Sequence, residues 1–213
     1  MSMLPLFPLP NVVLFPGRLL PLHIFEPRYR AMVADALQSD RLIGMVLLKP
    51  GRNSDYDGHT PIHAIGCTGV IVNTVRHEDG RYNIVLRGLD RFRILEENAD
   101  MAYRRAVVHL MPELPIDDVE REVLRELRGR LDARLGLPLQ AAGDGDHVQA
   151  RQLAALPDAE FVNTISQHLD LEPIEKQALL ERDTLRQRAE VLLELLDMRR
   201  LSVTMPPGSK VAH

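Results

Sequence analysis

The side chains that most often carry protein chemistry are few in this sequence, and they do not form a recognised reactive pattern. Cys67 is the only cysteine, so an intramolecular disulfide is excluded. It follows Gly66 in an apolar stretch, which favours a small buried core residue over a nucleophile, because a nucleophilic thiol needs a positioned base. His59 and His63 have the spacing of helical metal ligands, but Pro61 lies between them and no further ligand is near in sequence. We therefore predict no metal and no cofactor.

Motifs for phosphate and nucleotide chemistry are absent. None of the three lysines follows a glycine, which excludes the Gly-Lys-Ser/Thr end of a P-loop, where amides and one ammonium hold phosphates. Gly-x-Gly-x-x-Gly, Gly-x-Ser-x-Gly and His-Glu-x-x-His are also missing. The adjacent carboxylates Asp117 and Asp118 are interpreted as the start of a helix. We predict that the chain is not an enzyme, with an unrecognised site using Cys67 or the histidines as the alternative.

Charge and hydropathy argue against nucleic acids and membranes as partners. Residues 1–112 carry 13 Lys and Arg against 11 Asp and Glu, and residues 113–213 carry 13 against 19. Neither part has the strongly basic footprint that is typical of nucleic-acid binding. No apolar run approaches the roughly 18–20 residues that cross a bilayer. We expect a cytoplasmic protein without a membrane segment, and a monomer or weak dimer.

The elements that must position any site fall into two blocks. Short alternating or apolar runs with glycine and proline punctuation predict strands before residue 112. One helix interrupts them, with Tyr29, Met32, Val33, Ala36 and Leu37 on one face and Pro27 in its first turn. The triplet Glu78-Asp79-Gly80 predicts a hairpin turn, and Gly88 predicts a bend or bulge. The predicted strands are residues 4–9, 12–15, 19–25, 42–48, 62–75, 82–94 and 103–111.

The second block is helical. Leucine-rich periodicity, a Gly136–Pro138 stop and polar loops predict five helices. These are residues 119–135, 147–155, 158–168, 173–180 and 183–201. We predict an α+β fold with a β-rich lobe over residues 1–112, an α-helical lobe over 113–204 and a disordered tail over 205–213.

Five stretches of sequence resemble one protein family. They are residues 4–17 (LPLFPLPNVVLFPG), 20–32 (LPLHIFEPRYRAM), 65–71 (IGCTGVI), 79–94 (DGRYNIVLRGLDRFRI) and the weaker 176–181 (KQALLE). Together they resemble the N-terminal, substrate-binding domain of ATP-dependent Lon proteases, which also occurs in short bacterial proteins. The resemblance implies a PUA-like twisted β-barrel lobe with one embedded helix, followed by an α-helical bundle lobe. In full-length Lon proteins an ATPase and a peptidase follow, and we expect this chain to stand alone without them.

The implied activity is binding of unfolded or exposed polypeptide segments, or docking to a protease or chaperone. Arg87, Arg91 and Arg93 alternate with apolar residues, which predicts one solvent-side strip; it is either a solvated face or the polar rim of a peptide groove. Phe15 and Leu19 are core residues or partly exposed anchors. These five are our candidate peptide-binding residues. RNA binding through the barrel is the alternative, against which stand the missing basic stripe and the scarcity of aromatic residues.

Overall fold

The structure, a computed structural model, describes residues 3–50, 60–98, 100–135, 153 and 155–204. The chain divides into two compact units, and each is discontinuous in sequence. Unit 1 comprises residues 1–114 and 163–181, and unit 2 comprises residues 115–162 and 182–213. The combination of a sheet with helices confirms the predicted α+β class.

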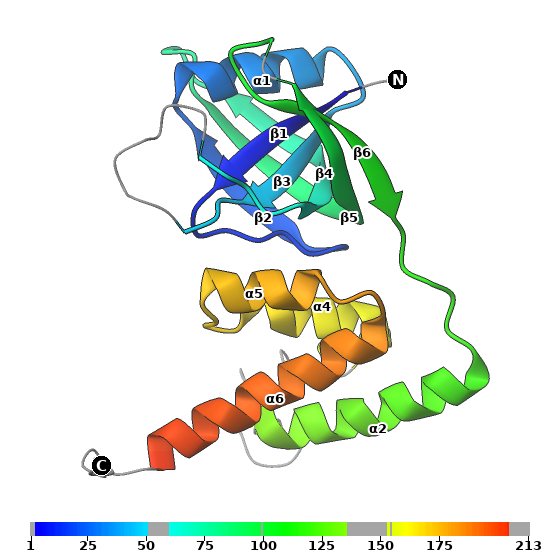
Figure 1. Ribbon diagram of the computed structural model, residues 1–213. Coiled ribbons are helices and arrows are strands. Elements are labelled where there is room, and N and C mark those ends of the chain that lie inside the picture. Colours follow the sequence, from blue (N-terminus) through cyan, green and yellow to red (C-terminus); the bar gives the residue numbers. More distant parts are fainter. Residues whose placement is uncertain (1–2, 51–59, 99, 136–152, 154, 205–213) are drawn as a thin grey trace, which may run out of the picture. The chain divides into compact units, whose positions relative to one another are not determined.

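Unit 1 is built on a six-stranded sheet whose order is β2-β5-β4-β3-β1-β6. A further pairing of β5 with β6 closes five of the strands into a ring, so that only β2 remains outside it as an edge (Figure 1). Strands β1 and β3 run parallel, and every other pair is antiparallel. The strands are β1 Leu4–Leu9, β2 Leu19–Ile24, β3 Leu42–Leu47, β4 Ile65–Arg76, β5 Tyr82–Asn98 and β6 Arg105–Met111.

The long strand β5 joins the ring to the edge strand. Its first half pairs with β2, its second half pairs with β6, and β4 pairs with both halves. The register against β4 shifts between Cys67 and Gly69, opposite Gly88, which confirms the predicted irregularity. A Cβ atom at Gly88 would lie 2.2 Å from the carbonyl oxygen of Phe15, so only glycine fits this position. Gly80, at φ 80°, closes the predicted hairpin between β4 and β5.

Helix α1, Pro27–Leu37, packs its predicted face on the barrel. Tyr29, Met32, Val33 and Ala36 are buried, and the Tyr29 ring lies 4.4 Å from that of Phe7. The sequence also predicts that Phe25 packs the helix against the barrel, and this is wrong: Phe25 is 60% exposed, because β2 ends at Ile24 and the chain turns there into the helix. The barrel core includes Leu4, Leu6, Val46, Ile62, Phe92 and Ala106.

Helix α5, Pro173–Leu180, belongs to unit 1 together with the last part of helix α4, Asp158–His168. Polar side chains attach these helices to the barrel. Gln177 Nε2 donates to the carbonyl of Ile65 at 2.9 Å, and the Phe15 amide donates to Gln167 Oε1 at 3.1 Å. The sequence prediction placed both helices in the helical lobe, whereas their contacts group residues 163–181 with the strands.

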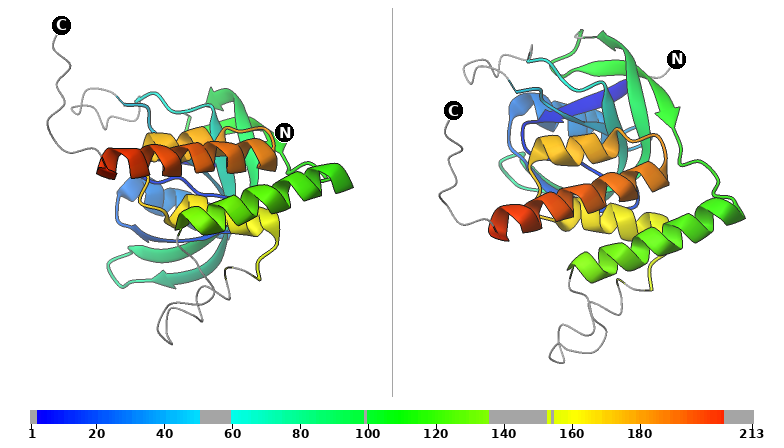
Figure 2. Two further views of the ribbon diagram at one scale, coloured as in Figure 1. Left: turned by 90° about the horizontal axis from the view of Figure 1, so that it is seen from below. Right: turned by 60° about the horizontal axis from the view of Figure 1, so that its bottom comes forward.

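Unit 2 consists mainly of helices α2, Asp118–Leu135, and α6, Leu185–Thr204, which lie side by side (Figure 2). Leu124, Leu127 and Leu131 of α2 are buried, as the apolar stripe predicted, but Val119 is 75% exposed. Arg128 adds a polar contact: its Nη1 bonds Asp158 Oδ1 at 2.9 Å, and its guanidinium lies over the Phe161 ring.

Three predictions cannot be compared with the structure in full. The predicted helix over 147–155 and the tail over 205–213 lie outside the described residues for all or nearly all of their length. The same holds for most of residues 50–61, which the sequence predicts to be a polar loop. The predicted strand over 12–15 is not one: those residues form no ladder and lead into the Pro16–Gly17 turn. Among the helices that the structure describes, none is both long and apolar enough to cross a membrane.

Candidate functional site

A three-by-three grid of side chains covers the outward surface of strands β2, β5 and β4. Cross-strand partners in a sheet share one face, so the register defines the rows. The rows are Leu19–Arg87–Val70, Pro21–Val85–Asn73 and His23–Asn83–Val75. We call these nine residues the outer face.

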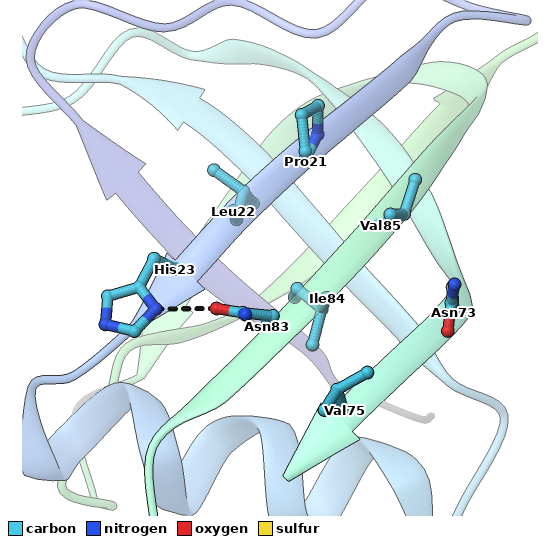
Figure 3. A pocket seen from close by; sticks show the side chains of 8 residues that line it. All are labelled: Pro21, Leu22, His23, Asn73, Val75, Asn83, Ile84 and Val85. Carbon is cyan, nitrogen blue, oxygen red and sulfur yellow. Dashed lines mark hydrogen bonds between the residues drawn. The ribbon is translucent and has the colours of Figure 1, made fainter. Parts of the chain in front are cut away.

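The outer face is accessible, and five of its nine side chains are apolar. Leu19 is 58% exposed and Val75 is 53% exposed, although both belong to the residue types that proteins usually bury. A hollow of about 410 Å³ opens on this surface, and most of its lining comes from the middle and lower rows of the grid. Figure 3 shows its residues on the three strands, with Pro21 and His23 on β2, Asn83 and Val85 on β5, and Val75 on β4. Clusters of exposed apolar side chains of this kind mark interaction surfaces in soluble proteins.

Histidine and aromatic rings form one margin of the outer face. His23 Nδ1 lies 2.6 Å from Asn83 Oδ1 (Figure 3). An amide oxygen only accepts hydrogen bonds, so Nδ1 is the donor in this contact. The His23 ring stacks on that of Phe25 at 6.2 Å between centroids, and His77 lies edge-on at 6.1 Å.

Arg87 is the only arginine, lysine or carboxylate among the nine outer-face residues. Arg87 is exposed, and within the part of the chain that the structure describes its guanidinium has no ion-pair partner. None of the nine outer-face residues is a carboxylate. The nearby turn carries the exposed Glu78 and also Asp79, whose carboxylate is paired with Arg81 Nε at 2.6 Å. Hydrogen bonds from the Arg81 backbone and side chain hold the pKa of Asp79 below its usual value, so it stays ionised and paired.

Two of the five predicted site residues meet on the outer face. Leu19 of β2 and Arg87 of β5 are direct cross-strand partners, and both are exposed. Arg93 is exposed too, but it lies in the second half of β5 opposite Ile65 and His109. Phe15 is fully buried, which matches the core alternative for this residue.

Arg91 departs from the predicted solvent-side strip, since only 2% of its surface is exposed. Its Nη1 donates to the carbonyl of Leu180 at 3.2 Å, and its Nε lies 3.6 Å from Glu113 Oε1. The alternation along β5 correctly assigns its side chains to the two faces of the strand, but helix α5 covers the outward face at Arg91. Arg91 therefore holds the end of α5 within unit 1 and is not available at the surface.

The residues considered for reactions or metals are not brought together. Cys67 is buried and its thiol donates weakly to the Thr68 carbonyl at 3.4 Å, as expected for a core residue. His63 pairs with Glu181, with 3.2 Å between Nδ1 and Oε1, and His59 lies outside the described residues. No group of three His, Cys, Asp or Glu side chains suited to a metal ion occurs in the described ranges.

The sequence reasoning missed Pro21, His23, Asn83 and Val75. A signal for them was present, because residues 19, 21 and 23 alternate with the less exposed residues of β2, and residues 83, 85 and 87 alternate with the buried residues of β5. Period-two patterns of this kind separate the faces of a strand. They do not show which strands are neighbours, and that neighbourhood creates the grid.

Comparison with known proteins places this fold in a family. Residues 3–198 match the family described as the ATP-dependent protease La (LON) substrate-binding domain. The chain belongs to this family. The match spans both units of the structure and all of the elements above except the last residues of α6. It confirms the resemblance found in the motifs between Leu4 and Glu181.

Several Lon proteases align with the chain. The Lon protease of Anaeromyxobacter dehalogenans is 28% identical over 93% of this chain and 23% of its own length. Lon protease 2 of Myxococcus xanthus is 30% identical over 93% and 24%, and the Lon protease of Paraburkholderia phytofirmans is 32% identical over 83% and 22%. The chain thus spans about a quarter of the length of these relatives.

Solved structures share the fold of this Lon-family chain. The N-terminal domain of the Mycobacterium avium complex Lon protease superposes with a TM-score of 0.69 at 19% identity, over 92% of this chain and 98% of that one. A Lon N-terminal domain protein from Xanthomonas campestris gives 0.57 at 22% identity, over 97% and 100%. At these identities the likeness establishes the architecture of the fold.

Proposed function

We propose that this protein binds unfolded or exposed polypeptide segments, without catalysing a reaction, and that the outer face of β2, β5 and β4 is the binding surface. The observation that carries the proposal is the exposed pair Leu19–Arg87 beside the hollow lined by Pro21, His23 and Val85. The family is described as the substrate-binding domain of a protease, and the substrates of proteases are polypeptides.

The chemistry of the surface fits such a ligand. An unfolded chain exposes apolar side chains that a folded protein buries, and Leu19, Val75 and Phe25 offer apolar area to receive them. Its backbone carbonyls and acidic side chains suit the Arg87 guanidinium, which has five N–H donors. The hollow lies on the outer surface of the sheet, where short stretches of extended chain can reach it. Ordering a flexible partner costs entropy, and we expect dissociation constants of roughly micromolar order.

As a finer proposal, the protein acts as an adaptor that presents its bound segment to a partner protease or chaperone. A weak and sequence-tolerant grip suits this role, because the segment must be released to the partner. Micromolar binding corresponds to about 8 kcal/mol, which a surface of a few apolar side chains and one arginine can supply.

The test is fluorescence anisotropy of the whole chain with labelled peptides of 15 to 20 residues rich in apolar and acidic residues. The double variant Leu19→Ser, Val75→Ser removes two exposed apolar side chains, each worth about 1 kcal/mol when half of its area is buried by a ligand. We expect the affinity to fall by about tenfold or more. Both positions are exposed, so the variant is expected to fold, and circular dichroism checks this.

Control substitutions are available in the second half of strand β5, outside the outer face. Leu95→Ser makes the same kind of substitution at a leucine that is 62% exposed but lies outside the outer face. Arg87→Glu reverses the one formal charge of the outer face, and we expect it to weaken binding of an acidic peptide. Arg93→Glu is its control, since both are exposed arginines of β5. If the outer-face variants and the controls bind equally well, the proposed surface is wrong. If the wild-type chain binds no unfolded peptide and instead binds structured RNA in a salt-dependent titration, the proposed function is wrong.

A further inference from the structure

The edge of strand β2 opposite β5 has no strand beside it in the described part of the chain. The sheet order begins with β2, whose only neighbour is β5. Ring closure through β5 and β6 removes the edges of the other strands over much of their length, but leaves this one. An uncovered edge presents main-chain donors and acceptors in a row and acts as a template for another strand.

The hydrogen bonds at the start of β2 fix which groups point outwards. Gly17, at φ 75°, donates to the Gly88 carbonyl at 2.9 Å, and Gly88 donates to the Arg18 carbonyl at 2.8 Å. This is the pattern of a bulge with glycine in its first position. It makes Arg18 and Gly88 a hydrogen-bonded pair, and such pairs alternate along an antiparallel ladder.

Counting from Arg18, residues 20, 22 and 24 direct their backbone groups to β5, whereas Leu19, Pro21 and His23 direct theirs to the open edge. Pro21 therefore stands where its missing N–H costs no bond to β5. The open edge offers the N–H groups of Leu19 and His23 and the carbonyls of all three residues. The side chains of the same three residues belong to the outer face, so one ligand can bond the backbone edge and contact the outer face at the same time.

We propose that the polypeptide segment binds as an added strand along the open edge of β2, with an acidic side chain directed to Arg87. This inference rests on the proposed function and names its mode of recognition. Strand addition obtains affinity from main-chain hydrogen bonds and selectivity from alternate side chains. Backbone groups are the same in every sequence, so this mode explains how one surface accepts many segments.

The charge of the outer face selects the chemistry of the occupant. Arg87 pairs directly with Leu19, so it lies one strand spacing from β2, a distance that an extended arginine side chain is long enough to bridge. No carboxylate lies among the nine outer-face residues to compete for it. An extended segment with apolar residues at alternate positions and one acidic residue is the partner that these groups complement. A second copy of this chain is a poorer match, because it would bring Arg87 against the same positive surface.

The test uses a fluorescein-labelled nine-residue peptide with a Glu-Val-Ile-Val-Thr core and Ser-Lys flanks, and five derivatives with one N-methylated core amide each. In an added strand, alternate amides point to β2 and the others to solvent. We expect methylation of every second amide to lower the affinity at least tenfold, and methylation of the amides between them to change it less than twofold. An even response along the core overturns strand addition.

Substitutions in the protein test the same main-chain hydrogen bonds that the peptide derivatives test. Pro21→Val supplies the missing N–H without disturbing the ladder to β5, and we expect it to bind the peptide about fivefold more tightly. Leu19→Pro removes an edge N–H and should bind more weakly than Leu19→Ala, which loses only the side chain. A Pro21→Val variant that is folded by circular dichroism and binds no more tightly than the wild type contradicts the proposal.

The outcomes separate this inference from the proposed function. If Leu19→Ser, Val75→Ser weakens binding but the methylation pattern is even, the surface is correct and strand addition is wrong. If the wild-type chain instead dimerises in sedimentation velocity and does not bind the peptide, a second copy is the occupant and both proposals fail.

Discussion

Arg91 offers the sharpest test of how unit 1 holds together. We predict that Arg91→Met destabilises the unit by about 3 kcal/mol. Methionine keeps most of the side-chain volume, so the cost arises mainly from polar groups. Loss of a charged donor leaves the buried Leu180 carbonyl without the bond it accepts at 3.2 Å, which costs roughly 1.5–3 kcal/mol. The ion pair with Glu113 spans 3.6 Å and is partly solvated on the glutamate side, so it adds about 1 kcal/mol or less.

Tyrosine fluorescence during urea denaturation measures this effect in the relevant unit. The sequence contains four tyrosines and no tryptophan, and every tyrosine precedes residue 115. With a denaturant dependence of about 2 kcal/mol per molar urea, the midpoint should fall by about 1.5 M. Arg93→Met is the matched control, since this arginine lies two positions along β5 and is exposed. Midpoints of the two variants within about 0.3 M of each other would refute the structural role of Arg91.

Three further predictions concern other positions. Burial, helped by the hydrogen bond from the Tyr103 hydroxyl to Asp35 Oδ2 at 2.7 Å, raises the pKa of Tyr103 to about 12. The stability that the neutral hydroxyl contributes to the fold is therefore complete below about pH 10 and is lost as the pH rises towards 12. The difference in unfolding free energy between wild type and Tyr103→Phe should shrink over that range, and a constant difference contradicts this. Gly88→Ala should cost about 2 kcal/mol in urea denaturation, because the new Cβ meets the Phe15 carbonyl oxygen at 2.2 Å. Gly129→Ala, in open space inside α2, should stabilise unit 2 by about 1 kcal/mol, measured as a higher thermal midpoint of the helical circular dichroism signal; an unchanged or lower midpoint argues against it.

Local features of the fold were predictable because their causes lie within a few residues. The spacing of Tyr29, Met32, Val33 and Ala36 specifies one helical face, and all four are buried. The hairpin at Gly80 follows from the backbone freedom of glycine. Strand order was not predictable in this way, because the parallel pairing of β1 with β3 depends on which strands meet after the whole segment has folded.

In the candidate site too, local features were predictable from the sequence and contacts between distant segments were not. Leu19 and Arg87 were identified from their types and positions, but their direct pairing across two strands 68 positions apart was not. Arg91 has the same alternation as Arg87, yet it is buried by Leu180, which is 89 residues away in the sequence. A period-two pattern distinguishes two faces of a strand; a distant element decides which of them meets solvent.

The discontinuity of unit 1 has a consequence for the order of events during synthesis. The ribosome makes all six strands before it makes residues 163–181, which supply Gln177 and the Leu180 carbonyl to the barrel. Until then Arg91 and the Ile65 carbonyl lack these contacts, so the nascent barrel is an incomplete folding intermediate. Residues 115–162 separate the two segments of unit 1 in the sequence, so they are synthesised before the second segment. A chain paused before residue 181 should consequently be more sensitive to proteolysis than the released protein.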